Sequence, residues 1–96
     1  MILSFGDAAT KDLYDGYRTA RARRFPSSLV NVALRKLDML NAAKTIQDLR
    51  SVVGNRFEHL KGPLKGFCSI RINDQWRIVF RWGDGNASDV RVTDYH

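Results

Sequence analysis

The hydrophobic period of the chain changes once, at Gly54 and Asn55, and this change constrains the fold more than any other feature. Before it, apolar residues recur about every 3.6 positions, as on one face of an α-helix. After it, apolar and polar residues alternate, which is typical of strands buried on one face. Helices followed by an antiparallel meander predict an α+β architecture, in which a short opening strand precedes two main helices packed on one face of a small sheet.

The first predicted helix spans residues 8–15. Asp7 can cap its start, because its carboxylate can accept a hydrogen bond from the first turn, and Gly16 can end it in a left-handed conformation. Thr45 and Asp48 resemble a cap pair and predict a short helical turn. The opening strand is expected to contain Ile2, Leu3 and Phe5, and the stripe of the first helix Ala9, Leu13 and Tyr17.

The second predicted helix, roughly residues 27–42, has the clearest period in the chain. Pro26 suits its start, because the missing N–H of proline would have no intrahelical partner there. The core stripe is predicted to contain Val30, Ala33, Leu34, Leu37 and Leu40. The other faces are predicted to carry Arg35, Lys36 and Asp38.

Four strands are predicted in the second half of the chain. They are expected at residues 56–60, 67–72, 76–82 and 89–93. The side chains that face the helices are predicted to be Cys68, Ile70, Ile72, Ile78, Phe80, Trp82, Val90 and Val92. By the same alternation, the open face of the sheet is predicted to carry Phe67, Arg71, Arg77, Arg81, Arg91 and Tyr95.

Four arginines on one sheet face would repel one another, so such a face favours an anionic ligand such as RNA or DNA phosphate. Phe67 would then offer a ring for stacking on a base. The alternative is that acids of neighbouring strands, such as Asp89, or the acidic end of a partner neutralise the arginines and that Phe67 packs locally.

Composition agrees with a basic, single-domain protein. The chain has 96 residues and a net charge of +6, and eleven of its sixteen cationic residues are arginine, whose planar fork matches phosphate oxygens. Its length fits one domain over residues 1–96. Cys68 is the only cysteine, so no internal disulfide is possible and a reducing compartment is expected. His59 and His96 lack zinc-ligand spacing relative to Cys68, so no metal is expected. Without a signal peptide or a long apolar run, the protein is expected to be cytoplasmic and not to involve a membrane.

Several short motifs, in this order and spacing, resemble one known family. They are Arg24-Phe25-Pro26, Ala33-Leu34-Arg35-Lys36-Leu37, Leu60-Lys61-Gly62, the run from Ser69 to Ile78, and the terminal Asp94-Tyr95-His96. The chain thereby resembles, over nearly its whole length, the HigB toxins (plasmid-maintenance killer proteins) of the wider RelE/ParE superfamily. The resemblance implies the RelE-like toxin fold.

The resemblance also implies an activity and partners. HigB toxins enter the ribosomal A site and cut mRNA during translation, as ribosome-dependent endoribonucleases (mRNA interferases) that need neither a metal nor a cofactor. The expected protein partner is a HigA-type helix-turn-helix antitoxin, which inhibits the toxin and represses the shared operon, so operator DNA is reached only through the antitoxin. A ParE-like toxin, which inhibits DNA gyrase by protein contact and cuts no RNA, is the alternative function, and a non-toxic antitoxin-binding module is a third.

The family motif assigns functional positions to Lys61, Asp94, Tyr95 and His96, and Arg77 matches the recurrent strand arginine of the superfamily. His96 is the expected proton-transfer group, because imidazole titrates near neutral pH. Lys61 and Arg77 would stabilise the phosphate. Tyr95 would stack on or orient the substrate, and Asp94 would orient His96 or contact a base edge.

One position departs from the best-studied branch of the family. Glu58 stands where that branch has a histidine three residues before the lysine of Leu-Lys-Gly, and His59 follows one position later. Neighbouring strand residues point to opposite faces, so His59 cannot simply replace the missing histidine. Either Glu58 serves as the base or the site relies on His96.

The basic connector between the two main helices contains Arg18, Arg21, Arg23 and Arg24. These arginines are open to three interpretations: contacts with ribosomal RNA, contacts with the antitoxin, or a solvated loop. Arg23 and Arg24, together with Arg71, Arg81 and Arg91, are the predicted RNA-binding residues.

Overall fold

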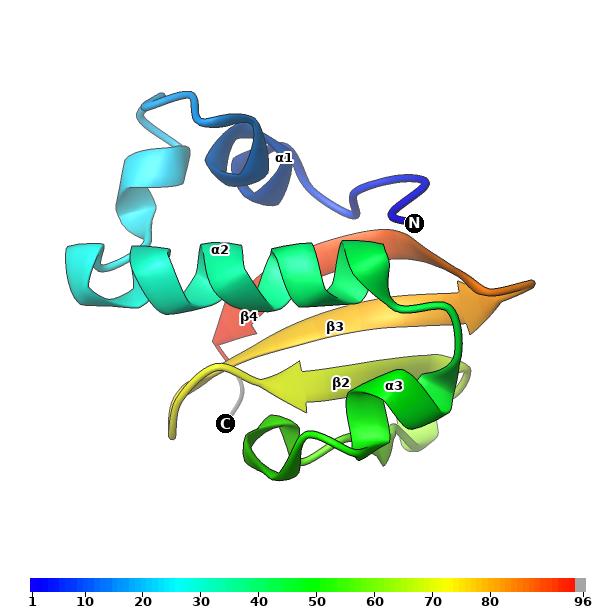
Figure 1. Ribbon diagram of the computed structural model, residues 1–96. Coiled ribbons are helices and arrows are strands. Elements are labelled where there is room, and N and C mark those ends of the chain that lie inside the picture. Colours follow the sequence, from blue (N-terminus) through cyan, green and yellow to red (C-terminus); the bar gives the residue numbers. More distant parts are fainter. Residues whose placement is uncertain (95–96) are drawn as a thin grey trace.

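The computed structural model describes residues 1–94 and has two layers, a helical layer over one face of an antiparallel sheet (Figure 1). The helices are α1 (Ala8–Asp15), α2 (Ser27–Ala42) and α3 (Ile46–Arg50). The strands are β1 (Glu58–His59), β2 (Phe67–Arg71), β3 (Trp76–Gly83) and β4 (Asn86–Asp94), in the order β1-β2-β3-β4. Short 3₁₀ turns lie at Ala22–Arg24, Val53–Asn55 and Gly62–Leu64. In residues 1–94, no helix is long and apolar enough to cross a membrane. The helices packed over one four-stranded antiparallel sheet confirm the predicted α+β fold class.

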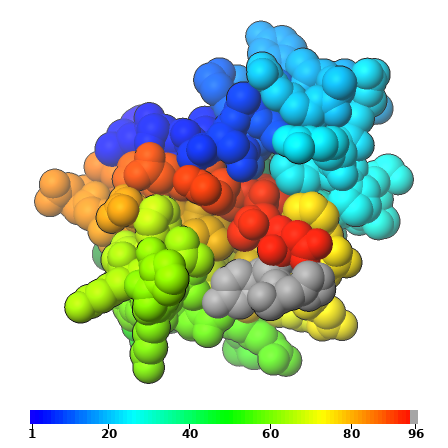
Figure 2. All heavy atoms as spheres, turned by 180° about the vertical axis from the view of Figure 1, so that it is seen from behind, coloured from blue at the N-terminus to red at the C-terminus, as the bar shows by residue number. Residues whose placement is uncertain are grey.

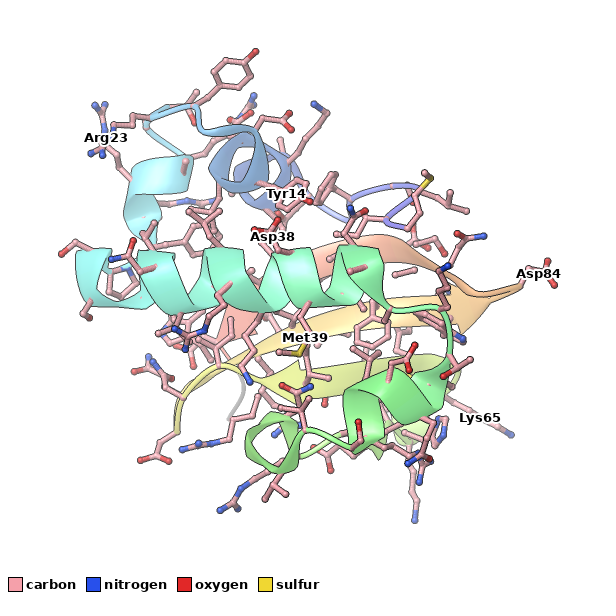
Figure 3. All side chains as sticks on the ribbon, in the orientation of Figure 1. Tyr14, Arg23, Asp38, Met39, Lys65 and Asp84 are labelled. Carbon is pink, nitrogen blue, oxygen red and sulfur yellow. The ribbon has the colours of Figure 1, made fainter. Side chains whose placement is uncertain are left out.

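Both predicted ends of α1 are confirmed. The Asp7 carboxylate accepts a hydrogen bond from Thr10 N at 2.8 Å, and Gly16 ends the helix at φ 84°. Tyr17 was expected on the apolar stripe, but it is 62% exposed because the left-handed glycine redirects the chain just before it. Tyr14 of α1 instead faces Asp38 of α2 (Figure 3). Burial and the Asp38 carboxylate raise the pKa of its hydroxyl, so a polar contact joins the two helices.

Helix α2 has the predicted bounds, but its buried stripe is rotated from the predicted one. Its buried apolar residues are Leu29, Ala33, Leu37 and Leu40, while Val30 and Leu34 are only partly buried. Lys36 was predicted to lie on a face outside the core stripe, yet it is buried, because the turn at Val53–Asn55 covers this side of the helix. Its Nζ donates a hydrogen bond to Asn55 Oδ1 at 2.5 Å.

A polar cluster around Asn55 joins α2 to the turn after α3. Asn55 is fully buried and donates from Nδ2 to Leu49 O at 3.0 Å and to Met39 Sδ at 3.3 Å. Met39 projects from α2 away from α1, toward this turn (Figure 3). Burial, followed by the charges of Arg35 and Arg71, lowers the pKa of Lys36. The cluster therefore holds a desolvated ammonium group under the helical layer.

Two strands are shorter or more interrupted than expected. The strand expected at residues 56–60 contracts to β1, because Arg56 takes a left-handed conformation (φ 42°, ψ 53°) directly before it. The opening segment runs parallel to β4 through two separate bridges, Ile2–Ala87 and Phe5–Val90. A shift in the register of β4, where Asp89 has φ 51°, separates the two bridges.

The predicted inward side of the sheet forms the main core. Seven of the eight residues expected there are buried under the helices: Cys68, Ile70, Ile72, Ile78, Phe80, Val90 and Val92. Trp82, the eighth, is partly buried and packs its ring at the edge of Phe80, with centroids 6.4 Å apart. The opposite side of the sheet carries the arginines together with Ser69 and Val79, which are both buried.

Candidate functional site

The strand register confirms the predicted arginine face. Arg71 pairs with Arg77, and the neighbouring rows pair Phe67 with Arg81 and Val79 with Arg91. All of these residues lie on the side of the sheet away from α2. Figure 2 views the molecule from this side, with the segment near residues 60–66 protruding beside the sheet. Phe67 is half-buried here, and the Arg81 guanidinium lies over its ring at 4.2 Å from the centroid.

Acidic residues lie next to three of the four arginines. Arg77 faces Glu58 at 3.5 Å, Arg81 faces Asp89 at 3.3 Å, and Arg71 pairs with Asp74. The guanidinium of Arg91 packs against Gly6, so closely that an added Cβ at that glycine would lie 2.7 Å from Arg91 Nε. Both features considered from the sequence are therefore present: a shared arginine face and local acids that lower its net charge.

Arg77 is the most firmly held arginine of this face. Its Nε donates to Ser69 Oγ at 2.8 Å, and its terminal nitrogen donates to the Arg56 carbonyl at 2.6 Å. Ser69 is fully buried, and the left-handed conformation of Arg56 presents that carbonyl to the guanidinium. The Arg77 side chain is only 12% exposed. A fixed cation of this kind stabilises developing phosphate charge without having to reorganise.

The structure brings Glu58 and Arg77 together and places Asp94 at the same end of the sheet. Asp94 is the last residue of β4 and pairs with Trp76, next to the Arg77–Thr93 pair. Gln75 Nε2 donates to Asp94 Oδ2 at 2.8 Å. A shallow hollow of about 250 Å³ lies beside Asp94 and is also lined by Arg24.

Lys61 is not part of this group. It is exposed and follows β1, beyond the hydrogen bond between Leu60 N and Phe67 O. It therefore lies toward the opposite end of the sheet from Asp94. Tyr95 and His96 lie outside the described residues.

His59 points away from the arginine face, as the alternation predicts. Its Nδ1 lies 3.5 Å from Cys68 Sγ, and its ring meets Phe57 edge-on at 5.2 Å between centroids. Burial raises the pKa of the Cys68 thiol. Glu58, and not His59, thus occupies the position beside Arg77.

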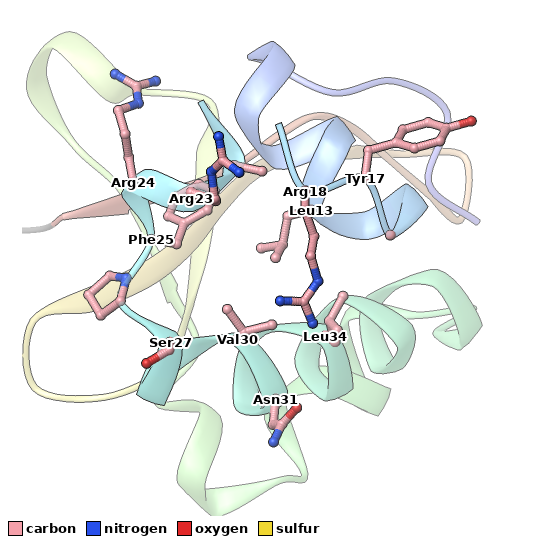
Figure 4. A pocket seen from close by; sticks show the side chains of 13 residues that line it. Leu13, Tyr17, Arg18, Arg23, Arg24, Phe25, Ser27, Val30, Asn31 and Leu34 are labelled. Atoms are coloured by element: carbon pink, nitrogen blue, oxygen red, sulfur yellow. The ribbon is translucent and has the colours of Figure 1, made fainter. Parts of the chain in front are cut away.

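The connector arginines do not lie on the sheet face. Arg23 and Arg24 belong to the 3₁₀ turn at Ala22–Arg24 and line a groove between α1 and α2 (Figure 4). Arg24 also lines the hollow beside Asp94, whereas Arg23 does not. Arg21 is engaged elsewhere, because its Nε contacts the Asp12 carboxylate at 2.5 Å.

Sequence reasoning missed two residues that shape this region. Ser69 reads as an ordinary solvated position of a strand, although its register places it diagonally opposite Arg77. Thr10 is fully buried, and its hydroxyl accepts a hydrogen bond from Val92 N at 2.9 Å, which ties the end of β4 to α1. In residues 1–94, no group of three or more His, Cys, Asp or Glu could hold a metal ion.

Solved toxin structures share this fold. A chain of the YoeB-YefM complex from Staphylococcus aureus aligns over 100% of this chain and 95% of its own length, with a TM-score of 0.61 and 20% identity. The YoeB/ParE toxin from Agrobacterium tumefaciens aligns over 99% of this chain and 98% of its own, with a TM-score of 0.55 and 19% identity. The helical layer and the sheet of this chain therefore have the RelE-like toxin fold.

Sequence comparisons identify the family within this class. The model of the RelE-like toxin of the type II toxin-antitoxin system HigB matches residues 2–96, so the chain belongs to the HigB-like toxin family. Toxin HigB-1 of Vibrio cholerae serotype O1 is 49% identical over 87 residues, which are 91% of this chain and 90% of that protein. Endoribonuclease HigB of Proteus vulgaris is 29% identical over 96 residues, the full length of both chains.

Proposed function

We propose that this toxin is a ribosome-dependent endoribonuclease that cleaves mRNA in the A site. The observation that carries the proposal is the Arg77 guanidinium, fixed by Ser69 and the Arg56 carbonyl next to the Glu58 carboxylate. A fixed cation beside a carboxylate, on a basic sheet face, suits the cleavage of a phosphodiester. The name of the full-length relative from Proteus vulgaris, an endoribonuclease, supports the same activity.

The proposed reaction uses the RNA's own 2′-hydroxyl. A base takes the 2′-OH proton, the 2′-oxygen forms a bond to the adjacent phosphorus, and the bond from phosphorus to the 5′-oxygen breaks. An acid donates a proton to the leaving 5′-oxygen, which gives a cyclic phosphate and a 5′-OH. Arg77 stabilises the charge on the phosphorane oxygens. Lys61, which lies further along the sheet, would bind the phosphate backbone of the same RNA.

Glu58 and His96 divide the proton transfers in this proposal. Glu58 is about half exposed, and within residues 1–94 its carboxylate pairs with Arg77 at 3.5 Å. A phosphate that binds Arg77 replaces this carboxylate, which is then available to accept the 2′-OH proton. His96 protonates the leaving oxygen, Asp94 orients His96 or contacts a base edge, and Tyr95 stacks on the substrate.

The remaining arginines are proposed to bind RNA. Arg71, Arg81 and Arg91 lie on the same face as Arg77 and would contact the phosphates of mRNA or ribosomal RNA. Arg24 does not lie on that face; it lines the hollow beside Asp94, at the end of the sheet, and would contact RNA there. Arg23 lies further away, on the groove between the helices, so its contact with ribosomal RNA would be peripheral and would require that groove to be free of a protein partner.

The proposed protein partner is a HigA-type helix-turn-helix antitoxin encoded in the same operon, which would link the toxin to operator DNA. The family description, a type II toxin-antitoxin system, supports an antitoxin. A fold relative is also known in complex with its antitoxin, as YoeB-YefM.

Primer extension on mRNA after induction tests the activity. We expect cuts within translated mRNA that disappear when initiation is blocked. His96→Gln is expected to abolish both the cuts and the growth arrest while antitoxin binding is retained; toxicity that survives the change would refute the role of His96. Inhibited supercoiling without RNA cuts would instead support the ParE-like alternative.

Glu58→Ala and His59→Ala form a matched pair, because the two residues are neighbours on opposite faces of β1. The proposal expects Glu58→Ala to slow cleavage and His59→Ala to preserve it. The reverse result would remove Glu58 from the site.

A further inference from the structure

A groove of about 690 Å³ lies on the helical side of the molecule, between the end of α1, the connector and the first half of α2 (Figure 4). Leu13, Val30 and Leu34 project into it from the two helices. Val30 and Leu34 are only partly buried, although α2 is otherwise packed against the sheet. The fold thus leaves an aliphatic floor accessible at this position.

Arginines surround this floor. Arg18, Arg23 and Arg24 all line the groove and are exposed. Arg18 extends over the floor, with its guanidinium near Val30 and Leu34 (Figure 4). Among residues 1–94, no carboxylate forms an ion pair with any of these three, whereas Arg21 of the same connector pairs with Asp12. The groove therefore combines apolar surface with uncompensated positive charge.

We propose that this groove binds an acidic amphipathic helix of the antitoxin. Aliphatic side chains at helical spacing would fill the floor, and carboxylates beside them would pair with the arginines of the rim. Arginine and tyrosine are enriched in protein interfaces, and Tyr17, which is 62% exposed, also lines this groove. The proposal rests on the proposed function only in assuming that an antitoxin exists.

The floor favours a protein over RNA as the occupant. Single-stranded RNA is held by aromatic rings on which bases stack. Here the exposed floor is made of leucine and valine side chains, and Phe25 at its edge is buried. Tyr17 at the rim is a single exposed ring and not the series of rings on which a strand stacks. A phosphate over the aliphatic floor would lose hydration, whereas an aliphatic side chain would be desolvated favourably.

Val30→Glu tests the groove with a single carboxylate placed on its floor. The matched control is Ser28→Glu, which adds the same charge to an exposed position of the same helix outside the groove. The probe is the purified antitoxin from the same operon, titrated into the full-length chain by calorimetry. We expect Val30→Glu to weaken binding by about 30-fold or more, as for the loss of a central contact, and Ser28→Glu to stay within about threefold.

Hydrogen exchange of the wild-type complex tests the same surface without a variant. Slower amide exchange in residues 16–34 on antitoxin binding is expected, and protection confined to residues 56–66 would overturn the proposal. The proposal would also be overturned if Val30→Glu bound the antitoxin with an affinity within about threefold of wild type. This holds even if the substitution weakened RNA binding. If the wild-type chain forms no complex with the purified antitoxin, both the proposed partner and the groove as its binding site are refuted. Neither measurement depends on RNA cleavage. A failure of the ribonuclease proposal would therefore be detected separately, by primer extension.

Discussion

Replacing Ser69 by alanine removes the hydroxyl that accepts a hydrogen bond from Arg77 Nε at 2.8 Å. Alanine fills almost the same volume, so the fully buried position stays packed and the strand register is unaffected. Arg77 keeps its bond to the Arg56 carbonyl and its ion pair with Glu58, but the contact that fixes Nε is lost and the guanidinium can rotate. The variant therefore reports on how firmly Arg77 must be held.

A hydrogen bond to a charged group contributes about 1.5–3 kcal/mol. If this amount is lost entirely from the transition state, the cleavage rate falls by about 10- to 150-fold. The effect is expected in kcat, because Arg77 would still attract the phosphate and leave KM nearly unchanged. Ser69→Thr retains the hydroxyl and is expected to recover part of the rate.

The assay is single-turnover cleavage of mRNA on programmed ribosomes. Ser88→Ala is the matched control, because Ser88 pairs with Arg81 on the same face of the sheet. Thermal unfolding of each variant separates a folding defect from a catalytic one. A Ser69→Ala rate within about twofold of wild type, with unfolding unchanged, would refute the claim that this contact prepares Arg77 for catalysis.

Two further predictions concern stability. Hydrogen bonds from Arg21 and then Thr19 lower the pKa of Asp12, so its contribution to stability is complete above its unfolded pKa and is lost as pH falls through its folded pKa. Asp12→Asn is thus expected to lower the free energy of unfolding near neutral pH and to weaken its dependence on pH in the acid range, as measured by urea unfolding at a series of pH values. An unchanged pH dependence in the acid range would contradict this. Gly6→Ala would place a Cβ 2.9 Å from Asp89 O and closer still to Arg91, so a loss of about 1–3 kcal/mol is expected by chemical denaturation. Gly54→Ala, with nothing within 4 Å of its Cβ, is the control, and equal losses in the two variants would refute the steric argument.

The features that could be predicted from the sequence are those set by short-range chemistry. Asp7 and Gly16 define the ends of α1 because capping depends on residues within one turn. The alternation in β2 and β3 assigns Arg71, Arg77 and Arg81 to one face because strand geometry leaves no other arrangement.

The features that were missed depend on what covers a residue in three dimensions. Lys36 looks like a solvated helical position, and only the turn carrying Asn55 makes it buried. The length of β1 is set by the left-handed Arg56, a conformation that the residue type does not suggest. Ser69 gains its importance from the register between β2 and β3, which pattern analysis gives only approximately.

The acids beside the arginines bear on how RNA binding would respond to salt. Arginines that bind RNA phosphates displace counterions condensed on the nucleic acid, and for single strands log K falls with log salt with a slope of about −0.7 for each phosphate neutralised. Four independent arginines would give a slope of about −2.8. Arg71, Arg77 and Arg81 must first leave Asp74, Glu58 and Asp89, and these freed carboxylates then recruit cations. Cation uptake by the protein offsets release from the RNA, so this face would bind RNA with a shallow salt dependence despite its many arginines.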